Sequence, residues 1–402
     1  DSGAAHADLT AVVGDDADVT ISVTDATGSI DATDLSVIGG STAGAVTVSN
    51  AQTISGTSAE VTAALVTSGT QVVLGAASTV TVSDATAVST AGTLAGVTNA
   101  TVGFTNGITG TVATLVDSGA AHADLTAVVG DDADVTISVT DTAINSANIV
   151  IVDAAAAGLV TVQATSITGS VADVKAAFEA NVAGSITGLG NEDVTLDAGT
   201  ALASNLQYIS DQLTGGGSLD ISNITDIQGS LTQLTNLYGS GDTMPSPASV
   251  TLTVTGSISS DSIVALDATS GGAIIDVSGA TMTDNPPSFT ASEANGLNVT
   301  GLSGIEITDA GASLTYDLTG FDGGSISSVE FSSGGEISAS FVTGGSLAAP
   351  FEQKDSDPSD GTDLSLGADF SSVGDLSLDS TGQAIDLSGT VFTFTTSGRT
   401  FT

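Results

Sequence analysis

Short runs in which valine or isoleucine alternates with threonine or serine recur along the first half of the chain. Clear examples are VTISV at 19–23, AVTVS at 45–49, TVTVS at 79–83 and LVTVQ at 159–163. Alternation with a period of two and β-branched side chains is typical of strands that bury one face. Because Gly, Ser, Asn and Asp separate the runs, the pattern predicts many short strands joined by turns.

A second pattern predicts short helices between these strands. The segments ISGTSAEVTAAL at 54–65, ITGSVADVKAAF at 167–178 and IQGSLTQLTNLY at 227–238 share Ile, one residue, Gly, a polar residue and then apolar residues at helical spacing. Ser or Thr directly before such a run is a helix N-cap signature, so each segment predicts a strand end that turns into a helix. The segment VTLDAGTALASNLQYISDQL at 194–213 predicts another strand and helix. The unit of strand and helix is therefore about 30 residues long and stacks on its neighbours.

One block of sequence occurs twice without change. The residues DSGAAHADLTAVVGDDADVTISVTD occupy 1–25 and again 117–141. We interpret the block as a structural module repeated for stacking, because an active site is seldom duplicated together with its flanking strand. The internal copy follows a predicted strand at 111–116, and the chain ends in the strand-like TVFTFTTSGRTFT. An open edge on the first copy and a spare terminal strand predict head-to-tail association.

These patterns predict a mainly β repeat fold. We expect a parallel β-helix-like solenoid with short helices between the strands of the first half, and an all-β second half that is either solenoid or sandwich. The predicted organisation is a repeat module at 1–116, a second module with short helices at 117–240, a linker at 241–249 that contains two prolines, and an all-β region at 250–402.

Composition narrows the possible partners. Three basic residues stand against 46 acidic ones, which gives a formal net charge of -43. Such a surface repels nucleic acid and anionic lipid head groups, so we exclude nucleic-acid binding. The chain has no Cys, which rules out disulfides and thiol chemistry. It also lacks an apolar run long enough for a membrane-spanning helix, so we expect no membrane insertion.

The acidic turns are the candidate metal sites. The sequence GDDAD occurs in both copies of the repeated block and places three carboxylates within four residues of a glycine-led turn. Carboxylate oxygens are the ligands that Ca²⁺ prefers. The alternative is a solvated turn that precedes a strand. The candidate ligands are Asp15, Asp16, Asp18, Asp131, Asp132 and Asp134.

The sequence gives little support for a catalytic function. Its two histidines, His6 and His122, are equivalent positions of the repeated block, and we interpret them as turn or packing residues. Aromatic and basic side chains, which line the clefts of many β-helix hydrolases, are scarce. We therefore assign no catalytic residues and expect the protein not to be an enzyme.

Several segments resemble the repeats of known bacterial surface proteins. ISGTSAEVTAAL, SITGSVADVKAAF and SITGLGNEDVTLDAGT are similar to repeats of large secreted proteins rich in Thr, Ala and Asp, prominent among cyanobacteria. GLNVTGLSGIEITDAG resembles strand repeats of S-layer proteins and of adhesins exported by type I secretion. The resemblance implies an extracellular structural role and ordering that depends on Ca²⁺. The GGxGxD array of calcium-binding nonapeptide repeats is missing, so calcium held in tandem turns of that kind is not implied.

Together these features predict a structural subunit of an extracellular or cell-surface assembly, an S-layer-like sheet or a filament. We expect self-association, Ca²⁺ as counter-ion and possible contact with a cell-surface polysaccharide. Two alternatives stay open: the stalk of a Ca²⁺-dependent secreted adhesin, and a secreted polysaccharide-active enzyme on a β-helix.

Overall fold

The computed structural model describes two units of the chain. Side chains and backbone are described for residues 6–67, 69, 72–97, 100–238, 249–284, 287–290, 293 and 297–302, and backbone alone for the strands at 304–307, 314–317, 328–331, 337–340, 351–354 and 376–379. Unit 1 comprises 1–196 with 211–219, and unit 2 comprises 197–210 with 220–402. This division does not test the module boundaries predicted at 116 and 240. Residues 241–248 of the predicted linker and the terminal strand-like segment at 390–402 lie outside the described residues.

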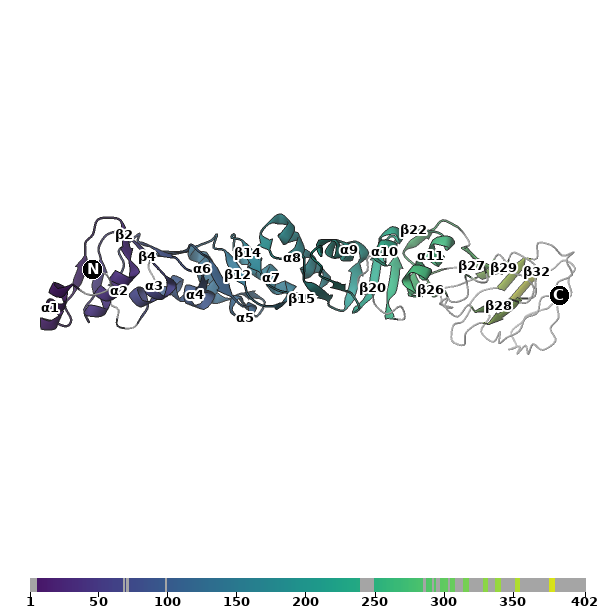
Figure 1. Ribbon diagram of the computed structural model, residues 1–402. Coiled ribbons are helices and arrows are strands. Elements are labelled where there is room, and N and C mark those ends of the chain that lie inside the picture. The colour runs from purple at the N-terminus through teal and green to yellow at the C-terminus, as the bar shows by residue number, and fades with distance from the viewer. Residues whose placement is uncertain are drawn as a thin grey trace, which may run out of the picture. The chain divides into compact units, whose positions relative to one another are not determined.

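Helices and strands alternate along the chain (Figure 1). The helices are α1 (Ala7–Asp15), α2 (Ala32–Ser41), α3 (Ser58–Leu65), α4 (Val88–Val97), α5 (Val112–Leu115), α6 (Ala123–Asp131), α7 (Ser146–Ala155), α8 (Val171–Ala183), α9 (Ala203–Gln212), α10 (Leu231–Tyr238) and α11 (Ser260–Ser270). Within the described part of the chain, no helix has the length and apolar character that crossing a bilayer requires.

The strands of unit 1 are short. They are β1 (Ile21–Val23), β2 (Ser29–Asp31), β3 (Val46–Val48), β4 (Thr53–Gly56), β5 (Val72–Val73), β6 (Thr79–Val82), β7 (Thr86–Ala87), β8 (Thr101–Phe104), β9 (Ile108–Gly110), β10 (Val116–Asp117), β11 (Ala120–Ala121), β12 (Ile137–Val139), β13 (Ala143–Asn145), β14 (Val160–Val162), β15 (Ser166–Gly169), β16 (Ile186–Thr187) and β17 (Asp193–Leu196). Strand β19 (Leu219–Asp220) begins at the last residue of unit 1.

Unit 2 holds the remaining strands. They are β18 (Gly199–Leu202), β20 (Ile224–Gly229), β21 (Thr251–Val254), β22 (Gly256–Ile258), β23 (Ile274–Asp276), β24 (Ala280–Met282), β25 (Ser288–Phe289), β26 (Val299–Thr300), β27 (Gly304–Ile307), β28 (Leu314–Asp317), β29 (Ser328–Phe331), β30 (Ile337–Ser340), β31 (Phe351–Lys354) and β32 (Leu376–Asp379).

Parallel pairing joins each strand to one that lies one strand-and-helix unit further along the chain. The sheets have the orders β1-β3-β5, β2-β4-β6-β8, β16-β14-β12-β9-β7 and β13-β15-β17-β19, and then β18-β20-β21-β23-β26, β22-β24, β25-β27-β29-β31-β32 and β28-β30. The hairpin of β10 and β11 is antiparallel. Paired residues are 22 positions apart at Val80 and Val102 and 29 apart at Ile108 and Ile137. Parallel strands need such a crossover connection, and helices supply it here.

The core lies between the strands and the helices. In β12, Ile137 and Val139 are buried while Ser138 between them is half-buried, which is the alternation that the sequence predicted. Helices turn an apolar face to the same core, as Leu125 and Val128 of α6 do. Helices of neighbouring strand-and-helix units also pack on each other: α2 on α3, α4 on α6 and α7 on α8 in unit 1, and α10 on α11 in unit 2.

The prediction of a mainly β, parallel β-helix-like fold is wrong. The described residues form a mixed α/β structure in which eleven helices accompany several separate parallel sheets. Some helices are long, since α8 has 13 residues. The prediction of an all-β region at 250–402 is also wrong, because α11 occupies Ser260–Ser270. Helices rich in Ala, Ser, Thr and Gly carry few large apolar residues, so their periodicity of 3.6 is faint beside the strong alternation of the strands.

The predicted strand-to-helix segments are confirmed. Thr57 accepts a hydrogen bond from the Glu60 backbone N–H, and the Glu60 carboxylate accepts one from the Thr57 N–H, which makes a capping box at the start of α3. Hydrogen bonds of the Glu60 carboxylate with the backbone N–H and with the side chain of Thr57 are the main causes that lower its pKa. Ser170 caps α8 in the same way through the N–H of Asp173. Each cap satisfies an N–H group that the first turn of a helix leaves without an intrahelical partner.

Glycine lies where the chain of one strand-and-helix unit crosses the backbone of the preceding strand-and-helix unit. A Cβ at Gly158, just before β14, would lie 2.1 Å from the carbonyl oxygen of Val135 and 2.3 Å from that of Asp134. Gly44, before β3, has the same relation to the carbonyl oxygens of Asp18 and Val19, at 2.2 and 2.5 Å. Direct backbone contact therefore sets the spacing between consecutive strand-and-helix units. A residue larger than glycine at these positions would prevent this contact.

We expect Gly158→Ala to lower the free energy of unfolding by about 1–3 kcal/mol, because its Cβ forces two packed backbones apart. Gly40→Ala is the matched control: a Cβ at this position of α2 meets no atom within 4 Å, and alanine should stabilise the helix by about 0.5–1 kcal/mol. Chemical denaturation measures both. Equal effects of the two variants would contradict the close approach at Gly158.

Candidate functional site

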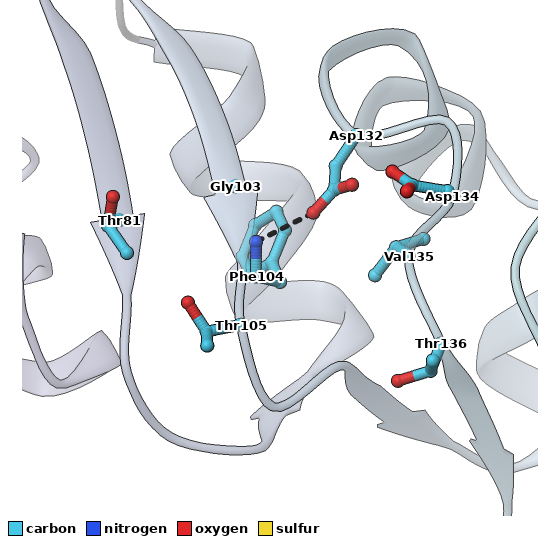
Figure 2. Close-up of a pocket in the computed structure, with 8 residues that line it drawn as sticks. All are labelled: Thr81, Gly103, Phe104, Thr105, Asp132, Asp134, Val135 and Thr136. Atoms are coloured by element: carbon cyan, nitrogen blue, oxygen red, sulfur yellow. Dashed lines mark hydrogen bonds between the residues drawn. The ribbon is translucent and has the colours of Figure 1, made fainter.

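The acidic turn of the second repeat lies beside an open groove in unit 1. Helix α6 ends at Asp131, the N–H of Asp132 still donates to the carbonyl of Val128, and the chain then enters β12. Figure 2 shows the carboxylates of Asp132 and Asp134 close together above the end of the neighbouring strand β8. The groove has a volume of about 340 Å³ and is lined by Thr81, Gly103, Phe104, Thr105, Asp132, Asp134, Val135 and Thr136.

Two of the predicted metal ligands hold the edge of a sheet. The Asp132 carboxylate accepts a hydrogen bond from the backbone N–H of Phe104 at 2.7 Å, drawn as a dashed line in Figure 2. The Asp131 carboxylate accepts one from the N–H of Val102 at 3.2 Å. Both donors belong to β8, the last strand of the sheet β2-β4-β6-β8. The acidic turn therefore satisfies backbone groups that an edge strand leaves without a partner strand.

Burial and neighbouring charges raise the pKa of Asp132. Removal from water is the largest cause, the hydrogen bond from Phe104 opposes it, and the carboxylates of Asp134 and Asp131 add to the rise. A second negative charge beside a partly buried carboxylate favours protonation. Bound cations would relieve the same repulsion.

The first repeat places the same residues in solvent. Asp15, Asp16 and Asp18 are all exposed, and the pKa of Asp16 is raised chiefly by a hydrogen bond with the side chain of Asp18. In the described residues, neither copy forms a cluster of three or more acidic or histidine side chains arranged to hold a metal. Calcium at these six aspartates thus stays a prediction. In the second copy, the side chains of Asp132 and Asp134 interact directly with each other.

The two histidines are helix caps in the described structure. The Nδ1 atom of His6 accepts a hydrogen bond from the N–H of Asp8, and that of His122 accepts one from Asp124. The distances are 3.3 Å and 3.2 Å. An acceptor at this position satisfies one free N–H of the first helical turn. The repeated histidine is therefore accounted for by the start of α1 and of α6.

Another group of aspartates carries a role that the sequence analysis missed. Asp84, Asp141 and Asp284 each follow a strand by two residues, in the sequences VSD, VTD and MTD. Each carboxylate accepts from the N–H of the first residue of a helix in the preceding strand-and-helix unit: Ser58 at 2.6 Å, Val112 at 2.7 Å and Ser260 at 3.1 Å. The signal that could have revealed them is a three-residue sequence at a strand end: an apolar residue, then Ser or Thr, then Asp.

These caps join neighbouring strand-and-helix units by charge as well as by hydrogen bonds. A carboxylate at a helix N-terminus interacts favourably with the positive end of the helix dipole. At Asp284, removal from water is the largest single influence and raises the pKa, but hydrogen bonds from Ser260 and from nearby backbone N–H groups outweigh it, so the pKa is lowered. A chain with three basic residues thus stabilises its carboxylates with backbone N–H groups.

Comparison with known proteins gives no relative: the sequence matches no protein-family model and no curated protein.

We expect Asp84→Ala to lower the free energy of unfolding by about 1 kcal/mol, the typical cost of removing a helix cap. Its carboxylate accepts from both the N–H and the hydroxyl of Ser58. Asp25→Ala is the matched control, because Asp25 also follows a strand by two residues, in the sequence VTD, but its carboxylate accepts from no residue in the described part of the chain. Denaturant unfolding should show a change below about 0.5 kcal/mol for the control. A loss of equal size at both positions would refute the assigned role of Asp84.

A second expectation concerns pH. Because the pKa of Asp132 in the folded chain lies above the ordinary value of 3.8, the folded state binds more protons than the unfolded state between these two values. This residue therefore lowers stability as pH rises from the ordinary carboxyl range through its folded pKa. Asp132→Asn keeps an acceptor for Phe104 without a charge, so its stability should depend less steeply on pH.

The measurement is the free energy of unfolding between about pH 4 and pH 7. Asp197→Asn is the control, since it removes one charge at an exposed position and should leave the slope close to that of the original chain. A slope for Asp132→Asn as steep as that of the original chain would contradict the assignment.

Proposed function

We propose that the protein is a structural subunit of an extracellular or cell-surface assembly, an S-layer-like sheet or a filament. The observation that carries the proposal is the recurring contact between strand-and-helix units. Within unit 1, all the paired strands except the hairpin of β10 and β11 pair in parallel, and helices of neighbouring strand-and-helix units pack on each other, as α2 and α3, α4 and α6, and α7 and α8 do. A chain built from units that stack by one recurring contact has end faces suited to the same contact with another molecule.

The charge of the chain supports a saline or calcium-rich setting for this assembly. Forty-six acidic residues and three basic ones produce repulsion between copies, which screening or bound cations reduce. We therefore include Ca²⁺ as the counter-ion of the assembly, with Asp15, Asp16, Asp18, Asp131, Asp132 and Asp134 as its candidate ligands. The resemblance of the repeats to secreted bacterial surface proteins agrees with an extracellular location.

Electron microscopy of the purified chain, with millimolar Ca²⁺ and with a chelator, tests the proposal. Ordered sheets or fibres that dissolve on chelation are the expected result. Asp132→Asn combined with Asp134→Asn should raise the Ca²⁺ concentration needed for assembly if the second acidic turn is a binding site. Asp197→Asn again controls for the loss of exposed charge. Dispersed single particles in both conditions would refute self-assembly and favour the stalk of an adhesin.

A further inference from the structure

The two copies of the repeated block have the same local structure and different burial. Residues 7–15 and 123–131 are both helical, and 21–23 and 137–139 are both strands. Val128 is 0% exposed, whereas its counterpart Val12 is 50% exposed. Leu125, Val135, Ile137 and Val139 are buried in the second copy, and their counterparts Leu9, Val19, Ile21 and Val23 are all less buried. Since the sequences are identical, this difference comes from what packs on each copy.

The segment 86–116 covers the second copy. Its helix α4 packs on α6, and its strand β9 pairs in parallel with β12. The N–H of Ile108 donates to the carbonyl of Thr136 at 2.8 Å, and the N–H of Thr140 donates to that of Gly110 at 3.0 Å. In the first copy, β1 pairs with β3 alone among the described strands. Among the described residues, no strand occupies on β1 the side that β9 occupies on β12, so this edge of β1 has backbone groups that a further strand could pair with.

Three carboxylates of the second copy also hold the covering segment. Asp131, Asp132 and Asp141 accept from the backbone N–H groups of Val102, Phe104 and Val112. Their counterparts are Asp15, Asp16 and Asp25. The Asp16 carboxylate forms hydrogen bonds with Asp18 of its own turn, and in the described part of the chain none of the three carboxylates accepts a backbone N–H from another segment. The first copy thus has the same apolar, strand-edge and carboxylate groups that bind the segment 86–116 in the second copy.

Two glycines make the fit of the covering segment specific. A Cβ at Gly92 of α4 would lie 2.5 Å from the Cβ of Asp124, so glycine permits the contact of α4 with α6. Gly107 has a φ of +70°, and a Cβ there would lie 2.2 Å from the Thr136 Oγ1 atom. A ligand for the first copy needs small residues at both places.

We propose that the face formed by Leu9, Val12, Ile21 and Val23, with Asp15, Asp16 and Asp25, is a docking surface. Its ligand is a polypeptide segment with the pattern of residues 86–116: a helix with glycine at its point of contact, a glycine turn, and an apolar strand that adds in parallel to β1. This inference goes beyond the proposed function, because it specifies the face and the chemistry of its ligand whether or not sheets or fibres form.

The absence of Cys from the chain allows a direct test with single cysteines. Val12→Cys reports on the exposed position and Val128→Cys on the buried one. Residues 86–116 are then fused in front of Asp1 of the full chain, which recreates the junction of Val116 with the repeated block. We expect a thiol reagent to label Val12→Cys at least about tenfold more slowly in the fused chain, and at a rate close to that of Val128→Cys.

The matched control carries Gly107→Val in the fused copy of the segment alone. This side chain clashes with the position of Thr20, the counterpart of Thr136, so Val12→Cys should label as fast as in the unfused chain. Leu9→Cys repeats the measurement at a second position of the face and guards against a local effect of one substitution. Fast labelling at both positions in the fused chain would overturn the proposal.

Labelling at several protein concentrations separates this inference from self-assembly. Protection of Val12→Cys in the unfused chain that disappears on dilution would overturn the choice of ligand and identify a second copy of the chain as the occupant. Protection only in the fused chain supports the proposal even where electron microscopy shows dispersed particles, so the two proposals can fail separately.

Discussion

The structure depends on parallel backbone pairing between consecutive strand-and-helix units. Strand-and-helix units, or strand repeats of 18 to 29 residues between paired positions, return the chain to the same sheet. Glycines such as Gly44 and Gly158 allow one backbone to cross directly against the preceding one. Large side chains contribute little, because aromatic residues make up 3% of the sequence. The core is built instead from Val, Ile, Leu and Ala at alternating strand positions and on one face of each helix. Stability therefore comes from many small, regular contacts between neighbouring units.

This arrangement also explains how a chain with so few basic residues accommodates its carboxylates. Asp84, Asp141 and Asp284 cap helices of the preceding unit, and Asp131 and Asp132 accept from the end of a strand. Backbone N–H groups take the place that Lys and Arg side chains have in ordinary proteins. Each such contact joins two strand-and-helix units, so the acidic residues contribute to the stacking of these units as well as to surface charge. Acidic positions without such a donor, as in the first GDDAD turn, remain in solvent and available to cations.

The sequence was most informative where a pattern is local. Alternation identified β1, β3, β6 and β14, and a polar cap followed by apolar spacing identified α3, α8 and α10. The overall class was predicted wrongly, because helices such as α4, with the sequence VSTAGTLAGV, have small residues that weaken the helical period. At the candidate site, the sequence located the acidic turns but not their contacts. Whether Asp132 meets a cation or the N–H of Phe104 depends on the register between distant segments, which local patterns do not contain.

The repeated block shows the same limit within one molecule. Its 25 residues encode a helix and a strand wherever they occur, whereas burial is decided by the neighbouring unit. Amide hydrogen exchange of β1 and β12 in the unaltered chain tests this claim most directly, because identical sequences have nearly identical intrinsic exchange rates. The account predicts that Ile21–Val23 exchange much faster than Ile137–Val139, since β9 and α4 cover the second strand alone. Equal protection of the two strands would contradict it.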